Sequence, residues 1–306
     1  MGNWNTTFAC KRSKSMRKQM DSMNHNTHHE GIKTVKVNKV CDFSGNSDLC
    51  ICVVTWNMNG QMVYEDLVEL VGSNSKSDLL VVGLQEVPPK NIARLLETAL
   101  VDTHVLLGKA IMQSLQLYVF GPQNSGLSIK ELKVDKHSVG GCGGLIRRKK
   151  GAVAICMSYN GIRMVFISCH LSAHARNVEQ RNSQCRHISH SLFSKYRNPY
   201  SRPAQVTFLT SKDQLLQEAE RGQVFDGYCE GTLSFKPTYK YDVGSSNYDT
   251  SYKVRVPSWT DRILFKIQDM EEIRASLHSY ESVDDIHSSD HKPVKAHLCL
   301  KVNEQP

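Results

Sequence analysis

The chain has 306 residues, of which 40% are hydrophobic, and a formal net charge of +8. This length and composition can supply one large domain or two small ones with a sizeable core. The longest apolar runs, such as residues 79–84, are far shorter than the ~18 residues of a membrane-spanning helix, and the first residues lack the apolar stretch of a secretory signal. The positive charge favours an acidic partner, and it leaves nucleic acid, a phosphorylated small molecule and an anionic membrane open.

The ten cysteines are scattered along the chain. None of their spacings, such as that of Cys50 and Cys52, is of the zinc-binding type, so no metal is assigned to them. Because no secretory signal is present, we expect reduced thiols.

Residues 1–47 are rich in Lys, Asn, Ser, His and Met and show neither helical nor strand periodicity, so we expect a disordered basic leader. Met1-Gly2 followed by Thr6 fits the pattern for N-myristoylation on Gly2, and Cys10 is a position for a second, palmitoyl chain. A basic cluster follows Cys10 and would strengthen a single acyl chain, which alone holds a membrane only marginally. A membrane anchor and a solvated tail without function both remain open.

After the leader, two apolar runs of strand length each end in polar side chains. Residues 49–54 lead to Asn57, and residues 79–84 are followed by Gln85 and Glu86. A carboxylate beside an amide at the end of a rigid strand offers the hard oxygen ligands that Mg²⁺ prefers. Taken alone, Glu86 fits an ordinary strand-end acid better.

A basic run at residues 147–150 precedes an apolar strand at 152–157, and a further strand at 164–169 ends at His170. Basic runs of this kind are usually solvated surface. An isolated histidine at the end of a strand is usually structural. Neither feature identifies a site without further information.

Two later loops combine lysines and tyrosines. Residues 236–242 contain Tyr239 and Lys240, and residues 247–253 end at Lys253. An ammonium group acts on a phosphate as a point charge, and a phenol donates a hydrogen bond to it. The loops are therefore candidates for gathering around a phosphate.

Residues 253–264 read Lys-Val-Arg-Val-Pro-Ser-Trp-Thr-Asp-Arg-Ile-Leu, so that Asp261 and Arg262 lead directly into an apolar strand. This arrangement places charged groups at the rim of a sheet. Near the end of the chain, Asp290 and His291 precede the last predicted strand. An aspartate beside a histidine can fix the tautomer of the ring.

The stretch 253–264 resembles the signature of the inositol polyphosphate 5-phosphatases, Arg-x-Pro-(Ser/Ala)-Trp-(Cys/Thr)-Asp-Arg-(Ile/Val)-Leu, and every position of it is met. The resemblance is to the plant-like type and covers nearly all of residues 48–300. It implies a catalytic domain at 48–306 with a DNase I-like fold, an α/β four-layer α/β/β/α sandwich of two mixed sheets. The site is then expected at one edge of the packed sheets.

The resemblance implies a reaction in which water attacks the 5-phosphate of an inositol head group directly, without a phosphoenzyme. Phosphoinositides of the PtdIns(4,5)P2 and PtdIns(3,4,5)P3 class are the implied substrates. Mg²⁺, held by Glu86 with Asn57 beside it, is the implied cofactor and would neutralise phosphate charge. The basic run at 147–150 is implied to face the membrane and the head group.

The resemblance also assigns roles to histidines, acids and phosphate-binding side chains. His291, oriented by Asp290, would donate a hydrogen bond to the scissile phosphate. His170 and Asp261 would complete the polar ring around that phosphate. The side chains implied to bind the substrate, mainly its 4-phosphate, are Tyr239, Lys240, Lys253, Arg255 and Arg262.

One segment departs from the family pattern. Members carry a strand ending in Trp-x-Gly-Asp-x-Asn, whose Asp activates the attacking water and whose Asn orients the phosphate, and no Gly-Asp-x-Asn occurs here between residues 198 and 216. Only residues 206–209 remain of an apolar strand. Asp213 is a poor substitute, because Ser211 and Gln214 read as a capping box that places Asp213 in the first helical turn. We therefore expect a gap in a sheet, with low stability and low activity.

Two other functions are weighed against an active 5-phosphatase. A catalytically impaired phosphoinositide-binding isoform on the same scaffold would keep the basic phosphate-binding residues and lack Gly-Asp-x-Asn, as this chain does. A nuclease would need a basic groove with aromatic side chains for stacking, so nucleic acid is not an expected partner. The expected partners are phosphoinositide lipids and an anionic membrane surface. We expect a monomer in the cytosol or at the cytoplasmic face of membranes, such as the plasma membrane.

Overall fold

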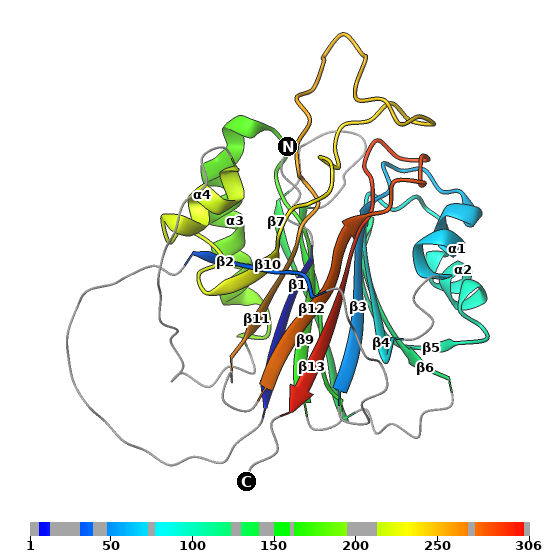
Figure 1. Ribbon diagram of the computed structural model, residues 1–306, viewed down its shortest axis with the longest axis vertical. Helices are drawn as coiled ribbons and strands as arrows, with labels where there is room; N and C mark the ends of the chain where they lie inside the picture. The colour runs from blue at the N-terminus through cyan, green and yellow to red at the C-terminus, as the bar shows by residue number, and fades with distance from the viewer. Residues whose placement is uncertain are drawn as a thin grey trace, which may run out of the picture.

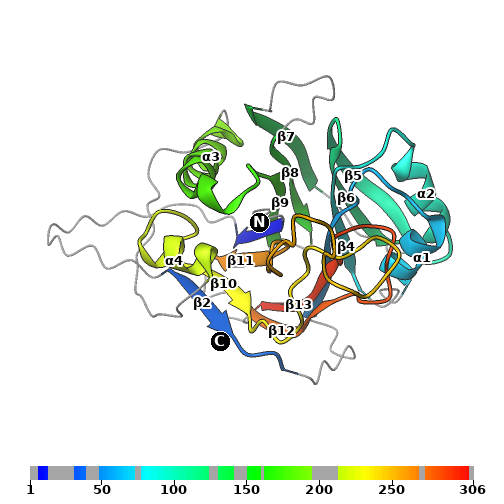
Figure 2. The ribbon, with the colours of Figure 1, turned by 90° about the horizontal axis from the view of Figure 1, so that it is seen from above.

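The structure, a computed structural model, consists of two β-sheets packed face to face with helices on their outer faces (Figures 1 and 2). It describes residues 6–12, 31–38, 48–72, 77–123, 130–140, 150–159, 162–194, 213–268 and 273–302. Two mixed sheets between helical layers confirm the expected α/β/β/α sandwich. In these residues no helix is both long and apolar enough to cross a membrane.

The first sheet has six strands in the order β12-β13-β3-β4-β6-β5. β3 and β4 run parallel, and the other neighbouring strands are antiparallel. Every residue of β4 is buried, which explains why its sequence is a continuous apolar run instead of an alternating pattern. The bounds are β3 Asp48–Asn57, β4 Leu79–Gln85, β5 His104–Met112, β6 Leu115–Pro122, β12 Ile273–Ser282 and β13 Val294–Val302.

The second sheet has seven strands in the order β2-β10-β11-β1-β9-β8-β7. The pairs β1/β11 and β2/β10 are parallel, and the remaining neighbours are antiparallel. The bounds are β1 Thr6–Arg12, β2 Ile32–Val35, β7 Lys130–Gly140, β8 Lys150–Tyr159, β9 Ile162–His170, β10 Tyr228–Gly231 and β11 Ile263–Ile267.

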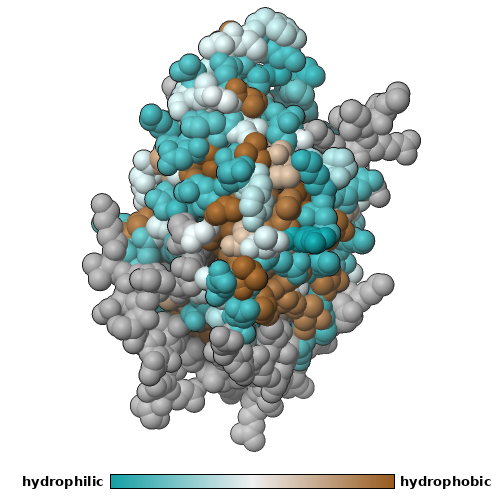
Figure 3. All heavy atoms as spheres, turned by 90° about the vertical axis from the view of Figure 1, so that its right-hand side faces the viewer, coloured by the Kyte–Doolittle hydropathy of each residue, from teal (hydrophilic) through white to brown (hydrophobic). Residues whose placement is uncertain are grey.

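Helices cover the outer face of each sheet (Figure 2). α1 (Tyr64–Gly72) and α2 (Ile92–Ala99) lie on the six-stranded sheet, and α3 (Val178–Ser191) and α4 (Gln214–Glu220) lie on the other, with the short 3₁₀ helix η1 (Ala175–Asn177) leading into α3. Seen from the side of α1 and α2, hydrophilic residues dominate the upper end of the molecule, with apolar residues scattered among them (Figure 3).

The main core lies between the two sheets. Alternate residues of β3 point to opposite faces, so Ile51 and Val53 pack in the core between the sheets, while Val54 and Trp56 pack under α1 and α2. The second sheet contributes side chains such as Ile155 to the same core. Full burial of each such side chain is worth about 1.5–3 kcal/mol, so this core fixes the two sheets against one another.

Two segments of the expected leader are strands, so the disorder expected for them is wrong. Thr6–Arg12 forms β1 in the interior of the seven-stranded sheet, parallel to β11 and antiparallel to β9, and Ile32–Val35 forms β2 beside β10. β1 hydrogen-bonds to β11 on one side and to β9 on the other, so the backbones of these two strands are paired at this position. The expected low stability of the shortened chain stays a prediction.

The structure bears on one of the two proposed acylation positions, Cys10, and not on the other, Gly2. Gly2 lies outside the described residues. Cys10 lies in β1, with its backbone opposite Met164 and Ile267, in the middle of a sheet. A backbone paired on both sides is a poor place for a lipid anchor that must reach a membrane, so the structure argues against palmitoylation of Cys10 in this state.

Two of the ten cysteines are joined, which corrects the expectation that all are reduced. Cys50 of β3 and Cys299 of β13 form a disulfide with a Cα–Cα distance of 4.3 Å. The two residues are direct partners in the antiparallel register of these strands, which brings their side chains together although 249 residues separate them.

A proline at Phe8 tests the interior position of β1. Phe8 is opposite Phe265 on one side and Phe166 on the other, and a proline removes a backbone donor and does not fit an interior strand. We expect Phe8→Pro to cost about 3 kcal/mol or more, seen in calorimetry as a fall in Tm of roughly 6 °C or more. Phe8→Leu keeps the N–H and should change Tm much less. Equal Tm for the proline variant and the parent would contradict this position of β1.

Candidate active site

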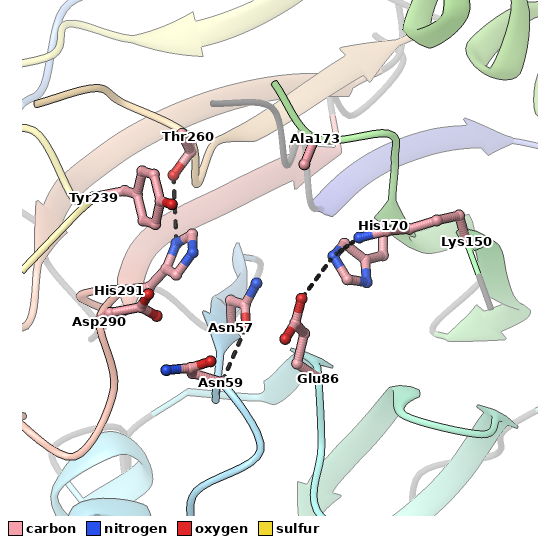
Figure 4. A pocket seen from close by; sticks show the side chains of 10 residues that line it. All are labelled: Asn57, Asn59, Glu86, Lys150, His170, Ala173, Tyr239, Thr260, Asp290 and His291. Atoms are coloured by element: carbon pink, nitrogen blue, oxygen red, sulfur yellow. Dashed lines mark hydrogen bonds and ion pairs between the residues drawn. The ribbon is translucent and has the colours of Figure 1, made fainter. Parts of the chain in front are cut away.

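A polar pocket opens at the edge where strands of both sheets end (Figure 4). Every lining residue except Ala173 carries a polar side chain. Residues from seven separate segments of the chain meet here, as the position of the site at one edge of the sheets requires. The lining residues are Asn57, Asn59, Glu86, Lys150, His170, Ala173, Tyr239, Thr260, Asp290 and His291.

Asn57 and Glu86 lie side by side because β3 and β4 are parallel and in register, with Asn57 opposite Gln85. The chain turns sharply at Glu86, whose backbone φ is 52°. Residues other than glycine rarely adopt this conformation. Backbone hydrogen bonds hold this turn, from Met58 N to Gln85 O (2.8 Å) and from Gly60 N to Glu86 O (2.8 Å). The turn directs the Glu86 carboxylate into the pocket, as Figure 4 shows.

A buried amide supports these strand ends from below. Gln85 is fully buried, and its Nε2 donates to Thr55 Oγ1 (3.2 Å) and Gly83 O (3.2 Å) in its own sheet and to Ser168 Oγ (3.3 Å) of β9. This last hydrogen bond joins the two sheets directly under the pocket. A satisfied polar network in a dry interior makes the geometry above it rigid.

Asp261, and not Asp290, orients His291. His291 Nδ1 donates to Asp261 Oδ2 at 2.8 Å, and this oxygen also accepts from Thr238 Oγ1 (2.8 Å) and Thr260 Oγ1 (2.9 Å). Asp261 is completely buried, so these donors replace the water that a carboxylate would otherwise bind. Asp290 instead presents its side chain to the pocket. The expectation that Asp290 orients His291 is therefore corrected.

His170 lies at the end of β9, almost fully buried, with its Nε2 3.5 Å from Glu86 Oε1 and in contact with Lys150 Nζ. Lys150 is the one described residue of the basic run at 147–150, and it lines the pocket instead of the outer surface. The antiparallel register explains this, because Gly151 is opposite His170 and so the start of β8 lies beside the end of β9. The sequence carried that signal, since the run immediately precedes a predicted strand.

The expected phosphate-binding side chains lie on the loop between β10 and β11, and only Tyr239 among them lines the pocket. The ring of Tyr239 stacks on His291 with centroids 4.4 Å apart. Lys240 Nζ donates to Asp249 Oδ1 at 3.0 Å, which raises the pKa of Lys240. Lys253 is exposed and Arg255 half-buried further out on the same loop.

Arg262 is not a substrate ligand in this structure, which corrects its assignment. The side chain is 1% exposed, and its guanidinium donates to Glu230 Oε1 (2.6 Å), Glu230 Oε2 (2.5 Å) and Asp213 Oδ2 (2.5 Å). Neighbouring residues at a strand start point to opposite faces, so Asp261 contacts His291 while Arg262 reaches Asp213 at the start of α4. Arg262 stabilises the fold between the sheet and that helix.

Asp213 is the N-cap of α4 and is held away from the pocket. Its Oδ1 accepts from Leu215 N (2.9 Å) and Leu216 N (3.3 Å), while its other oxygen binds Arg262. The expected capping box placed Asp213 inside the helix, and Asp213 is itself the capping residue instead. Both of its oxygens are engaged, which supports the view that Asp213 does not replace the lost base.

Comparisons with known proteins decide the family. A family model described as Endonuclease/Exonuclease/phosphatase family 2 matches residues 54–209 and 199–297. The type IV inositol polyphosphate 5-phosphatase 11 of Arabidopsis thaliana is 56% identical over 327 residues, which cover 98% of this chain and 98% of that protein. The chain belongs to the inositol polyphosphate 5-phosphatase family.

Other relatives agree with this assignment. Phosphatidylinositol 4,5-bisphosphate 5-phosphatase A of Mus musculus is 30% identical over 82% of this chain. The aligned part covers only 31% of that longer protein. The solved inositol polyphosphate 5-phosphatase domain of synaptojanin, in complex with inositol (1,4)-bisphosphate and a calcium ion, matches with a TM-score of 0.63 and 26% identity over 83% of this chain and 86% of that one. Cimex nitrophorin, at 20% identity and a TM-score of 0.61 over 84% of this chain and 100% of that one, shares the fold alone.

The comparisons also bear on the segment in which this 5-phosphatase departs from the family. The 327-residue alignment with the Arabidopsis relative is longer than the 306 residues of this chain, so the relative has positions without a counterpart here. The family-model match is split into two pieces that meet at residues 199–209. This is where Gly-Asp-x-Asn is missing. The strand expected at 206–209 lies outside the described residues.

The pocket's donor set fits a hard divalent cation, in keeping with a family of metal-dependent phosphatases. The Glu86 carboxylate and the Asn57 amide offer oxygen ligands at adjacent strand ends. Mg²⁺ usually takes one or two carboxylates and completes its shell with water and substrate phosphate. Within the described ranges no cluster of three or more His, Cys, Asp or Glu side chains could hold a metal ion.

Replacing Arg262 tests its structural role. Arg262→Met leaves Glu230 and Asp213 without their cation, and breaking a buried pair in this way typically costs about 3–5 kcal/mol. Urea unfolding measures the loss of free energy of unfolding. Arg255→Met removes the same charge from the half-buried loop position and should stay within about 0.5 kcal/mol of the parent. An Arg262→Met variant as stable as the parent would return Arg262 to the list of substrate ligands.

Proposed function

We propose that the chain is a Mg²⁺-dependent phosphomonoesterase that removes the 5-phosphate from phosphoinositides such as PtdIns(4,5)P2 and PtdIns(3,4,5)P3. The observation that carries the proposal is a single pocket that gathers Glu86, Asn57, His170 and His291 beneath the loop that begins at Tyr239. Relatives named for phosphatidylinositol 4,5-bisphosphate support this substrate class. The enzyme would act as a monomer at the cytoplasmic face of membranes.

Some pocket residues would bind the negative charge of the phosphate, and others would donate or accept a proton. Asp261 accepts a hydrogen bond from Nδ1 of His291, so Nε2 would donate to an oxygen of the scissile phosphate from the ring that carries both protons. Lys150 and His170 bring further donors to the opposite wall. A cation held by Glu86 and Asn57 would neutralise phosphate charge and stabilise the leaving inositol oxygen.

Asp290 is the described carboxylate best placed to accept the proton of the attacking water. The carboxylates that line the pocket in the described residues are those of Glu86 and Asp290. Glu86 is the proposed metal ligand, and Asp213 is engaged by Arg262 and by the start of α4. Asp290 thereby takes part of the role that the family gives to the missing Gly-Asp-x-Asn aspartate.

A phosphoinositide-binding protein without turnover is the second candidate, favoured by the missing Gly-Asp-x-Asn. Removing a general base typically costs ~10²–10⁴ in rate, and losing an amide that orients the phosphate adds to this. Such a protein would keep the loop of Lys240, Lys253 and Arg255 and bind lipid head groups. The two candidates differ in phosphate release and agree in binding.

Replacing Glu86 tests the proposed function. Parallel assays should follow phosphate release from short-chain PtdIns(4,5)P2 with and without Mg²⁺, and head-group binding by calorimetry. We expect Mg²⁺-dependent release that falls ~10²–10³-fold in Glu86→Gln, because the metal loses its carboxylate. Glu97→Gln, an equal change at an exposed position of α2, should leave the rate unchanged.

The outcomes separate the two candidates. Release at the background rate by the parent chain, with head-group binding intact, would select the binding protein instead. A Glu86→Gln variant as fast as the parent would remove Glu86 from its proposed role. Restored release in a version that carries the missing Gly-Asp-x-Asn segment would attribute the deficit to that segment.

A further inference from the structure

A loop of this 5-phosphatase exposes apolar side chains to an unusual degree. Tyr252 is 90% exposed, Val254 70% and Val256 65%. The loop rises above the ends of both sheets and forms the tip of the molecule in Figure 1. Single exposed apolar residues are normal on protein surfaces, but three within five residues at a projecting tip mark an interaction surface.

The loop is held in this shape by hydrogen bonds at its base. Asp249, which is buried, accepts from Arg255 N at 2.8 Å, from Ser251 N at 3.2 Å and from Lys240 Nζ at 3.0 Å. Hydrogen bonds to the carboxylate, that from Ser251 first among them, hold the pKa of Asp249 well below its usual range. A fixed base means that the apolar tip is presented in one arrangement.

The backbone at the tip is strained in a way that keeps an apolar side chain outside. Val254 has a φ of 37°, which a β-branched residue adopts only at a cost, and its N–H donates to Ser251 O at 2.9 Å. In a loop with no contact to make, an unstrained conformation with less apolar exposure would be preferred. A strained backbone that keeps Val254 exposed is expected where this side chain contacts another surface, such as a partner molecule or a membrane.

Cations alternate with the apolar residues. Lys253 and Arg255 lie between Tyr252, Val254 and Val256 in the sequence, and Lys253 Nζ is 5.4 Å from the centre of the Tyr252 ring. Partial desolvation, followed by the charges of Arg255, Arg176 and Lys253, lowers the pKa of His174, so cations of the loop lie near this histidine. Apolar and basic groups side by side match the interface of an anionic bilayer.

The loop is joined directly to the rim of the pocket. Its two ends are tied together by hydrogen bonds between Tyr239 and Ser258, in both directions at 2.7 and 3.2 Å, and Tyr239 lines the pocket. A bilayer that receives the tip therefore lies on the side of the molecule to which the pocket opens. A lipid head group at that surface would be within reach of Lys240 and the pocket below it.

We propose that residues 252–256 form a docking wedge that inserts Tyr252, Val254 and Val256 into the interface of an anionic lipid bilayer, while Lys253 and Arg255 contact lipid phosphates. This inference rests on the proposed function, because it supplies the surface on which that substrate is presented. Tyrosine is well suited to the role, since its ring is apolar and its hydroxyl remains in the hydrated head-group layer.

A bilayer explains the loop better than a protein partner does. A protein interface usually has an apolar core with charges depleted from it and placed at its rim. Here every apolar residue is next to a cation, and the space-filling view shows hydrophilic and apolar residues interspersed at this end of the molecule (Figure 3). Both cations, Lys253 and Arg255, are also expected phosphate binders, which links the docking surface to the lipid head group.

Vesicle binding of a double variant, Tyr252→Ser with Val256→Ser, tests the wedge. Neither residue belongs to the pocket or to the phosphate-binding set. The matched control is Val101→Ser, 57% exposed after α2, beside His104 at the end of the six-stranded sheet opposite to the pocket. Phosphatidylcholine vesicles with and without phosphatidylserine, free of phosphoinositide, serve as the probe in a sedimentation assay.

We expect the parent and the control to bind the phosphatidylserine vesicles, and added salt to weaken that binding. The double variant should bind ~10–100-fold more weakly, because the apolar part of the interaction is lost. Its phosphate release from short-chain soluble PtdIns(4,5)P2 should equal that of the parent, while release from vesicle-borne lipid falls. This split distinguishes loss of docking from loss of the site.

Several results would overturn the wedge. Equal vesicle binding by the double variant and the parent would show that the loop does not insert, and so would a parent that ignores phosphatidylserine vesicles. A parent that dimerises without vesicles, with a monomeric double variant, would make the loop an interface between copies. The vesicle assay contains no substrate, so it remains decisive even where no phosphate release is found and the proposed function fails.

Discussion

The buried carboxylate of Asp261 connects the parts of the site. It accepts hydrogen bonds from Thr238, Thr260 and His291, which belong to three stretches of chain: the loop that carries Tyr239, the approach to β11, and the loop before β13. Burying a carboxylate away from water costs free energy unless hydrogen-bond donors replace the water. Each of these three stretches supplies one donor to Asp261, so the same carboxylate fixes the position of all three. Catalytic geometry and local stability therefore depend on one side chain.

The sheets supply the frame in which this carboxylate acts. Parallel pairing of β3 with β4 sets Asn57 beside Glu86, and the antiparallel pairing of β8 with β9 sets Lys150 beside His170. Packing of the two sheets brings these pairs together in one pocket, where Glu86 lies beside His170 (Figure 4). The charged groups are thus in place before substrate arrives, which is how preorganised electrostatics lowers a barrier to phosphoryl transfer.

The sequence predicted the strand ends that carry Asn57, Glu86 and His170, because continuous apolar runs followed by polar residues are local signals. The fold class followed from the resemblance to the 5-phosphatase family and not from these local signals. It did not predict β1, whose seven residues mix polar, apolar and basic types without a strand period. The disulfide of Cys50 with Cys299 depends on register between distant strands. Arg262 was also assigned a role in substrate binding and Asp290 the role of orienting His291, and both assignments were wrong. Each relied on a neighbouring residue in the sequence, whereas the folded backbone decides the direction in which a side chain points.

The tautomer of His291 is the most direct test of the central role of Asp261. Nitrogen-15 correlation spectra of labelled histidine, with the His291 signal assigned by its loss in His291→Gln, report which ring nitrogen carries the proton. The account predicts a proton on Nδ1 in the parent chain and in Asp290→Asn, and a changed protonation pattern in Asp261→Asn. An unchanged pattern in Asp261→Asn together with a changed one in Asp290→Asn would contradict it.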